Sequence, residues 1–215
     1  MSVLTGSMQD YLKAIYKLQQ GRGVVSTSEI AGRLHVSAAS ATNMVKRLAQ
    51  LRLVTYARYQ GFSLTPAGQR IALEIIRHHR LIETYLAQHL GVPLEKVHSE
   101  AERMEHVLSE DVEARMATAL GNPVQDPHGD PIPSADGTMR DVRYPKLGSL
   151  SPGEGGVVAH VSDQRPGLLR RLARLGVLPG VRLTMLARRR SGCDVEIGGR
   201  QLTLSHTLCE GVYVQ

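Results

Sequence analysis

One stretch of the chain, HSEAERMEHVLSED at residues 98–111, is dense in side chains that can bind a metal ion. It holds two imidazoles and five carboxylates, with apolar residues between them. On a helix, His98, Glu102, Glu105 and His106 would share one face, because their spacings are three, four, seven and eight residues. Carboxylate and imidazole ligands without thiolate suit Mn²⁺, Fe²⁺, Co²⁺ or Zn²⁺.

A second pair of ligand-type residues precedes this stretch. His79 and Glu83 are four residues apart in a segment with helical periodicity, so two antiparallel helices would bring both sets together. The spacing leaves a second interpretation open, because Glu and His on helices mostly face water. We interpret Glu100, Glu110 and Asp111 as solvated charges. No nucleophile–base arrangement and no phosphate-binding glycine loop is found, so the sequence does not indicate an enzyme.

The elements that must position these side chains begin with a basic N-terminal segment. Residues 1–64 carry eight Lys/Arg against two Asp/Glu, a net charge of +6. Residues 65–147 have a net charge of −4 and contain six of the nine histidines, and residues 148–215 have a net charge of +4. A basic head suits a polyanion such as DNA, and the acidic centre suits cations.

The basic segment has the pattern of a helix-turn-helix. A first helix is predicted over residues 7–20, where apolar residues recur every three or four positions. Two shorter helices follow, and the turn between them is HVS at residues 35–37. Thr27 or Ser28 is the predicted cap of the first of these helices, and Ser37 is the predicted cap of the second.

The next residues predict a wing. Strand-like residues 53–57 and 62–65 flank a turn that carries Arg58. Small polar and cationic residues near the second short helix are the candidate contacts with DNA. These candidates are Thr27, Ser37, Ser40, Thr42, Asn43, Lys46, Arg47 and Arg58. The alternative is an ordinary small helical domain with a hairpin.

Three further helices are predicted after the wing. The first begins at Pro66 behind the cap Thr65, the second runs from Pro93 to about Leu108, and the third follows the cap Ser109. Their wide apolar stripes predict a dimer interface. From residue 148 onwards, short strand patterns alternate with glycine turns around one helical piece, which predicts a small β-barrel. The expected domains are 1–65, 66–122, a linker at 123–147, and 148–215.

Two features bear on location. The chain has no apolar run long enough to cross a bilayer and no signal-peptide pattern at its start. Cys193 and Cys209 are its only cysteines, so no disulfide framework is indicated. We therefore expect a cytoplasmic protein that has no membrane partner.

With these motifs in place, the chain resembles the DtxR/MntR/IdeR family of metal-dependent regulators. The resemblance rests on SMQDYLKAIYKL, VSTSEIAGRLHVSAASATNMVKRL, LTPAGQRIALEIIRHHRLIETYL, VHSEAERMEHVLSEDVEARM and GDPIP. The run GLLRRLARLGVLPGVRL resembles the SH3-like (FeoA-type) third domain of the longer members. The resemblance implies a mainly α fold with an N-terminal winged helix-turn-helix, a helical dimerisation domain and a C-terminal small SH3-like β-barrel.

The resemblance also implies partners and ligands. It implies a homodimeric repressor that binds double-stranded operator DNA of metal-homeostasis and transport genes, with no small organic substrate. The implied primary metal site comprises Asp10, Glu102, Glu105 and His106. The implied ancillary site comprises His79, Glu83 and His98, with Asp163 or Gln164 of the third domain as an additional ligand.

The identity of two residues favours manganese within that family. Iron-type members carry Met and Cys where this chain has Asp10 and Glu102, so Mn²⁺ is expected, with Fe²⁺ as the alternative and other divalent transition metals able to substitute in vitro. Lys13 departs from the short manganese-type members, which have there a Glu that joins a two-metal cluster. One primary ion and a separate ancillary ion are therefore expected.

Two other functions stay open at this point. The first is a winged-helix regulator that responds to a non-metal signal, with the His/Glu cluster as surface charge. The second is a metal-handling or enzymatic protein in which the basic head is incidental.

Overall fold

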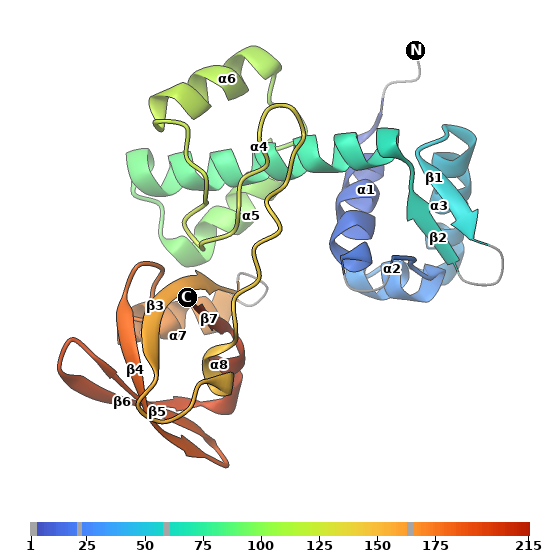
Figure 1. Cartoon of the computed structure of the whole chain (residues 1–215). Helices are drawn as coiled ribbons and strands as arrows, with labels where there is room; N and C mark the ends of the chain where they lie inside the picture. Colours follow the sequence, from blue (N-terminus) through green and yellow to red (C-terminus); the bar gives the residue numbers. More distant parts are fainter. Residues whose placement is uncertain (1–3, 21–22, 58–60, 163–165) are drawn as a thin grey trace. The chain divides into compact units, whose positions relative to one another are not determined.

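The computed structural model describes residues 4–20, 23–57, 61–162 and 166–215 (Figure 1). The predicted site residues Arg58, Asp163 and Gln164 lie outside this part of the chain. The chain divides into two compact units, which share helix α4 (Pro66–Leu90). Unit 1 comprises Met1–His78, Glu105–Val107 and Pro133–Met139. Unit 2 comprises His79–Met104, Leu108–Ile132 and Arg140–Gln215.

Unit 1 contains the predicted three helices and hairpin. They are α1 (Gly6–Gln19), α2 (Thr27–Leu34), α3 (Ala38–Gln50), β1 (Val54–Ala57) and β2 (Gly61–Leu64). The two strands pair antiparallel, with Val54 opposite Leu64. The apolar positions of the three helices and Phe62 of the hairpin form one buried core, in which Leu12 and Leu48 are fully buried. The helical spacing of apolar residues thus places α1, α2 and α3 around a single centre.

The beginning of α2 corrects one prediction. Ser26, and not Thr27 or Ser28, is the N-cap: Ser26 Oγ accepts a hydrogen bond from the Glu29 backbone N–H at 3.3 Å. Glu29 Oε2 accepts one from the Ser26 backbone N–H at 2.8 Å, which completes a capping box. These two reciprocal hydrogen bonds favour Ser26 as the cap, so helix α2 begins at Thr27. Ser37 caps α3 as predicted and accepts from the Ser40 backbone N–H at 3.1 Å.

The remaining helices of the α-helical part follow α4. They are α5 (Leu94–Met104) and α6 (Glu110–Ala119). Ser109 caps α6 as predicted, with its side chain accepting from the Val112 backbone N–H. Helix α5 ends four residues before the predicted Leu108, and the chain turns at residues 105–107. Glu105 and His106 therefore lie in a turn, and the prediction that they share a helix face with Glu102 is wrong.

The C-terminal part is an antiparallel sheet domain with strand order β6-β5-β4-β3-β7. Its elements are η1 (Leu147–Ser149), β3 (Gly155–Val161), α7 (Pro166–Leu175), β4 (Arg182–Arg189), β5 (Gly192–Ile197), β6 (Arg200–Ser205), α8 (His206–Glu210) and β7 (Val212–Val214). The strands and α7 were predicted, whereas α8 was not. "Mainly α" is therefore too strong a description, because this whole domain is built on a sheet with its own buried core.

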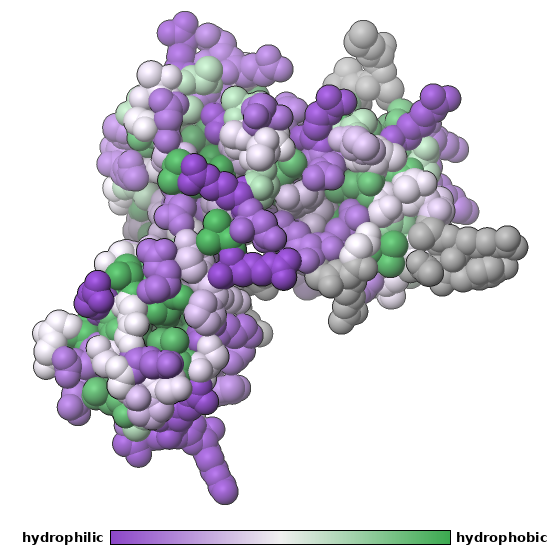
Figure 2. Space-filling view, viewed as in Figure 1, coloured by the Kyte–Doolittle hydropathy of each residue, from purple (hydrophilic) through white to green (hydrophobic). Residues whose placement is uncertain are grey.

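The surface is polar over most of the face seen in Figure 2, and its apolar residues form small separate patches. In the part of the chain that the structure describes, no helix combines the length and the apolar character needed to span a bilayer.

Candidate metal centre

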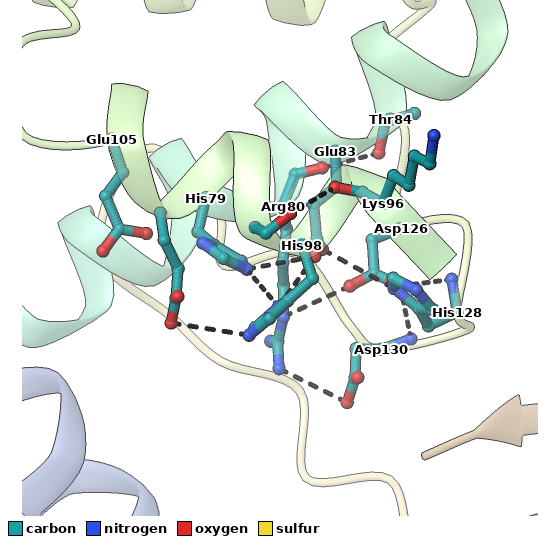
Figure 3. A network of polar contacts seen from close by, with 12 residues as sticks. His79, Arg80, Glu83, Thr84, Lys96, His98, Glu105, Asp126, His128 and Asp130 are labelled. Carbon is teal, nitrogen blue, oxygen red and sulfur yellow. Dashed lines mark hydrogen bonds and ion pairs between the residues drawn. The ribbon is translucent and has the colours of Figure 1, made fainter. Parts of the chain in front are cut away.

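Helices α4 and α5 bring together the three residues predicted for the ancillary site. His79 and Glu83 are buried on successive turns of α4, and His98 faces them from α5 (Figure 3). Glu83 Oε1 lies 3.0 Å from His79 Nε2 and 3.1 Å from His98 Nδ1. The two imidazole nitrogens are 3.0 Å apart. Three potential ligand atoms thus form a nearly equilateral triangle.

This triangle has the dimensions of one face of a metal coordination shell. Two ligands that lie about 2.1 Å from an ion and at right angles to each other are themselves about 3 Å apart. One carboxylate and two imidazoles are also donors that divalent transition metals prefer. The residues present therefore fit a divalent ion in both spacing and donor type.

The second oxygen of Glu83 belongs to another group of ligand-type residues. Glu83 Oε2 lies 3.7 Å from His128 Nδ1, and Asp126 completes a fully buried set. The His128 ring nitrogen Nε2 lies 3.3 Å from the Leu94 carbonyl oxygen, which can only accept, so Nε2 carries the proton. His128 Nδ1 faces the two carboxylates and is the nitrogen that would bind a metal ion in place of a proton.

Sequence reasoning missed Asp126 and His128. They lie in the loop QDPHGDP, which has no periodicity from which to infer a shared face. The available signal was an acidic residue two positions before a histidine in a turn-forming segment. Asp126 Oδ1 accepts from the backbone N–H groups of His128 at 2.8 Å and Asp130 at 2.9 Å, so it also folds this loop.

Arg80 neutralises part of the negative charge in this loop. Its Nε lies 3.6 Å from Asp126 Oδ2, and its Nη2 lies 3.3 Å from Asp130 Oδ1. Arg80 also donates to the Pro131 carbonyl oxygen. Figure 3 shows the guanidinium between helix α4, on which it is carried, and the loop.

The two buried carboxyls of this region have opposite pKa shifts. Burial alone would raise the pKa of Glu83, but hydrogen bonds from His128, His79 and His98, together with the attraction of His79, hold that pKa well below its usual range. The pKa of Asp126 is raised well above its usual range by burial and by the negative charges of Asp130 and Glu83. The lowered pKa favours the charged form of Glu83, which can bind a cation, whereas the raised pKa favours the neutral form of Asp126.

The loop of Asp126 and His128 is joined to the sheet domain. The Val161 backbone N–H on β3 donates to the His128 carbonyl oxygen at 2.9 Å. His160 Nε2 of the same strand lies 3.2 Å from Asp130 Oδ2. At Gly129 the backbone approaches β3 so closely that a Cβ there would clash with the Ala159 carbonyl oxygen. The third domain is thus packed directly against this set of ligand-type residues.

A separate group lies in unit 1. Asp10 Oδ1 on α1 lies 3.0 Å from His106 Nε2, and Glu105 Oε1 lies 3.5 Å from the same nitrogen. The opposite ring nitrogen, His106 Nδ1, lies 2.7 Å from Gln9 Oε1. If Gln9 presents this oxygen, Nδ1 carries the proton and Nε2 is an acceptor that faces two carboxylates. The geometry and donor set of Asp10, Glu105 and His106 fit one divalent ion.

Glu105 is held from two further directions. Its carboxylate is fully buried, and Oε1 lies 2.5 Å from Nζ of Lys13, one turn after Asp10 on α1. Its backbone carbonyl oxygen lies 3.1 Å from His78 Nδ1. These contacts fix the turn at residues 105–107 against α1, so that Glu105 and His106 are positioned without needing to be helical.

The fourth residue of the predicted primary site, Glu102, belongs to unit 2. Its side chain is 53% exposed, and its Oε1 lies 3.5 Å from His98 Nε2. Two of the charges interpreted as solvated, Glu100 and Asp111, form exposed ion pairs with Arg103 and Arg115 on their own helices. Such pairs contribute little to stability.

The predicted DNA contacts gather at α3. Ser40, Asn43, Lys46 and Arg47 are exposed on this helix, and Ser37 is exposed at its start. Thr42 is half-buried, and its hydroxyl donates to the Ala38 carbonyl oxygen at 2.8 Å. Thr27 is half-buried in the first turn of α2.

Comparison with known families matches three successive segments. Residues 3–62 match "Iron dependent repressor, N-terminal DNA binding domain". Residues 65–134 match "Iron dependent repressor, metal binding and dimerisation domain", and residues 146–215 match "FeoA domain".

Individual relatives match over the whole chain. The iron-dependent repressor IdeR of Mycobacterium tuberculosis (strain ATCC 25618 / H37Rv) is 32% identical, covering 100% of this chain and 99% of the relative. The diphtheria toxin repressor of Corynebacterium diphtheriae (strain ATCC 700971 / NCTC 13129 / Biotype gravis) is 31% identical over 96% of this chain and 91% of the relative. A solved structure of a manganese-dependent transcriptional repressor in complex with manganese is 39% identical, with a TM-score of 0.88 over 96% of this chain and 98% of that one. The structure of the manganese regulator SloR is 31% identical, with a TM-score of 0.77 over 99% of each chain.

Proposed function

The chain belongs to the iron-dependent repressor family and is a metal-dependent transcriptional repressor, and from this premise we propose that it senses Mn²⁺ and represses metal-transport genes as a homodimer. One observation carries the proposal. Asp10 Oδ1 lies 3.0 Å from His106 Nε2, so a ligand on a DNA-binding helix faces a ligand from the segment that matches the metal-binding domain.

The donor chemistry supports Mn²⁺. The three candidate groups consist only of carboxylates and imidazoles. Carboxylates suit Mn²⁺ better than they suit metals that prefer soft ligands such as thiolates. We assign Glu102 to the primary site with Asp10, Glu105 and His106, as the fourth hard ligand. Fe²⁺ is the second candidate, because relatives 32% identical to this chain are named iron-dependent repressors.

The proposed switch is electrostatic. A divalent ion, when bound, supplies the positive charge that relieves repulsion between the Asp10 and Glu105 carboxylates. Asp10 then holds α1 to the turn at residues 105–107, and α1 packs in one core with α3. Metal binding thereby favours one arrangement of the recognition helix, which is a two-state equilibrium biased by a ligand.

DNA recognition is assigned to the exposed face of α3. We propose that Ser37, Ser40, Thr42 and Asn43 contact base edges or sugar, because small polar side chains can both donate and accept hydrogen bonds. Lys46, Arg47 and Arg58 would contact DNA phosphates, and Thr27 at the start of α2 would lie beside the sugar-phosphate backbone of the DNA.

The two groups that share Glu83 are assigned to further ions. His79, Glu83 and His98 form the ancillary site, and Glu83, Asp126 and His128 form an additional site beside the third domain. Asp163 stays the candidate for a further ligand from that domain. It follows Val161 by two residues, and the Val161 N–H donates to the His128 carbonyl oxygen.

Exposed apolar residues support dimerisation through the helical part. They cluster in the sequence between the end of α4 and the beginning of α6: Leu90, Met104, Val107 and Val112. Val107, at 83%, is the most exposed of the four, and a partner that covered it would remove apolar surface from water. A two-fold dimer would present two α3 helices to two half-sites.

An electrophoretic shift assay tests the proposal. The full chain is incubated with promoter DNA of metal-transport genes in the presence of Mn²⁺, anaerobic Fe²⁺ or a chelator. The proposal predicts a shift with Mn²⁺ that the chelator reverses. DNA binding that is indifferent to metal would instead indicate a regulator of another signal. Failure to bind any of these promoters under all three conditions would contradict the proposed target class.

A further inference from the structure

A buried cation from the protein itself touches the Asp10–Glu105–His106 group. Lys13 Nζ lies 2.5 Å from Glu105 Oε1. The Lys13 side chain is only 11% exposed and the Glu105 side chain is 0% exposed. The two residues come from distant parts of the chain, so this pair joins α1 to the turn at residues 105–107.

The ammonium shares an oxygen with the candidate metal ligands. Lys13 follows Asp10 by three residues on α1, so both side chains project from the same face of that helix. The oxygen that accepts from Lys13, Glu105 Oε1, is also the one that lies 3.5 Å from His106 Nε2. Any ion held by Glu105 and His106 must therefore coexist with a fixed positive charge on the same carboxylate.

We propose that the Lys13 ammonium is a permanent cation of this centre, which competes with a bound divalent ion for Glu105 and so weakens the binding of that ion. The inference rests on the proposed function, since it assumes that Asp10, Glu105 and His106 bind a metal. Two like charges in a partly buried site repel each other strongly, because solvent screens them poorly.

The metal-free state explains why such a cation is useful. Without Lys13, the buried Glu105 carboxylate would face the Asp10 carboxylate and would lose its ammonium partner on α1. A buried charge is costly unless it is paired. Lys13 keeps Glu105 paired when the metal leaves. The affinity for metal then reflects a competition between one ammonium and one divalent ion, which sets the concentration at which the protein responds.

The test uses Glu83→Gln as its background, because this substitution removes the carboxylate shared by the other two groups. Mn²⁺ titration calorimetry on the full chain compares Lys13 with Lys13→Arg, which keeps the charge, and Lys13→Met, which keeps length without charge. We expect one ion per protomer for Lys13 and for Lys13→Arg. Lys13→Met should bind Mn²⁺ about tenfold more tightly or better.

Each result separates the possible failures. A background protein that binds no Mn²⁺ would contradict the proposed primary site itself. One ion in the background protein, with Lys13→Met binding no tighter than Lys13→Arg, would overturn the Lys13 inference alone. Thermal unfolding in chelator checks that the variants fold. If Lys13→Met does not, Lys13→Gln removes the same charge with a polar end, and it must also show tighter binding.

Discussion

Glu83 Oε1 lies 3.0 Å from His79 Nε2, while the other oxygen of the same carboxylate faces a different imidazole. One buried side chain thus belongs to two ligand groups at once. Its position on the buried side of helix α4, between α5 and the loop of residues 126–130, makes this sharing possible.

The shared carboxylate gives a prediction about metal content. Glu83→Gln should remove the ions of both groups, whereas His98→Ala and His128→Ala should each remove one, because each imidazole belongs to a single group. Elemental analysis after equilibrium dialysis against Mn²⁺ measures the number of ions per protomer. Equal losses in the three variants would show that the two groups do not bind separate ions.

The link between α1 and the turn at residues 105–107 gives a second prediction. Asp10→Ala should weaken Mn²⁺-dependent operator binding by at least about 100-fold, because a ligand on the DNA-binding helix is lost. Dimerisation should survive, as measured by analytical ultracentrifugation. Asp111→Ala is the matched control, since this exposed carboxylate forms an ion pair with Arg115 of its own helix and its loss should leave binding unchanged. Unchanged operator binding in Asp10→Ala would exclude the proposed bridge.

Metal preference should depend on the residue at position 102. Replacing a carboxylate by a softer thiolate in Glu102→Cys should shift relative affinity from Mn²⁺ toward Fe²⁺. Competition titrations of the two ions under anaerobic conditions give the ratio directly. A ratio equal to that of the unmodified protein would remove Glu102 from the explanation of selectivity.

The raised pKa of Asp126 gives a prediction for metal-free protein. The folded state binds this proton more tightly than the unfolded chain does, so stability falls as pH rises from the usual Asp range, about 3.9, through the folded pKa. Asp126→Asn removes the penalty and keeps an oxygen that can accept from the loop N–H groups. In chelator at neutral pH, we expect the variant to melt at a higher temperature than the parent protein.

Asp136 provides a control of opposite sign, because hydrogen bonds from Ser134 and Thr138 lower its pKa. Its contribution to stability is present above the unfolded pKa and is lost as pH falls through the folded one. Asp136→Asn should therefore not raise the melting temperature at neutral pH. A lower melting temperature for Asp126→Asn than for the parent in chelator would contradict the assignment.

The close approach of Gly129 to β3 gives a prediction of stability. Gly129→Ala should lower the free energy of unfolding by about 3 kcal/mol. The loss has two causes: the added Cβ would clash with the Ala159 carbonyl oxygen, and alanine is strained at the left-handed backbone conformation of this position. Gly153→Ala has nearly the same φ, +87° against +89°, but nothing within 4 Å of its Cβ, and should cost only about 1 kcal/mol. Denaturant titration in chelator compares the two, and equal losses would exclude the packing contribution.

Most helices could be predicted because their ends carry strong local signals. Thr65 and Pro66 mark the beginning of α4, and Ser109 marks that of α6. The end of α5 carries no such stop signal, so its apolar pattern was extended past Met104. Helix α8 is only five residues long, which is too short to show helical periodicity.

Within the candidate sites, pairs of residues on one helix could be predicted from sequence, whereas pairs that depend on tertiary packing could not. His79 and Glu83 could be paired from sequence, because residues four apart on a helix must be neighbours. Asp126 and His128 could not, because the position of a loop relative to α4 depends on tertiary contacts such as that of Arg80 with Asp126. The position of Lys13 near Asp10 follows from helix spacing, whereas its pairing with Glu105 depends on where a distant turn packs.

The main-chain hydrogen bond between Val161 and His128 bears on whether the third domain can be exchanged between related proteins. A sheet domain that was connected to the rest of the chain only through a linker could be exchanged between relatives by itself. Here strand β3 and the loop that supplies Asp126 and His128 pack so closely at Gly129 that an added methyl group would clash with the Ala159 carbonyl oxygen. Chimeras that exchange residues 146–215 alone would separate two surfaces that pack against each other, so we expect a stable exchange to include the loop of residues 126–130 as well.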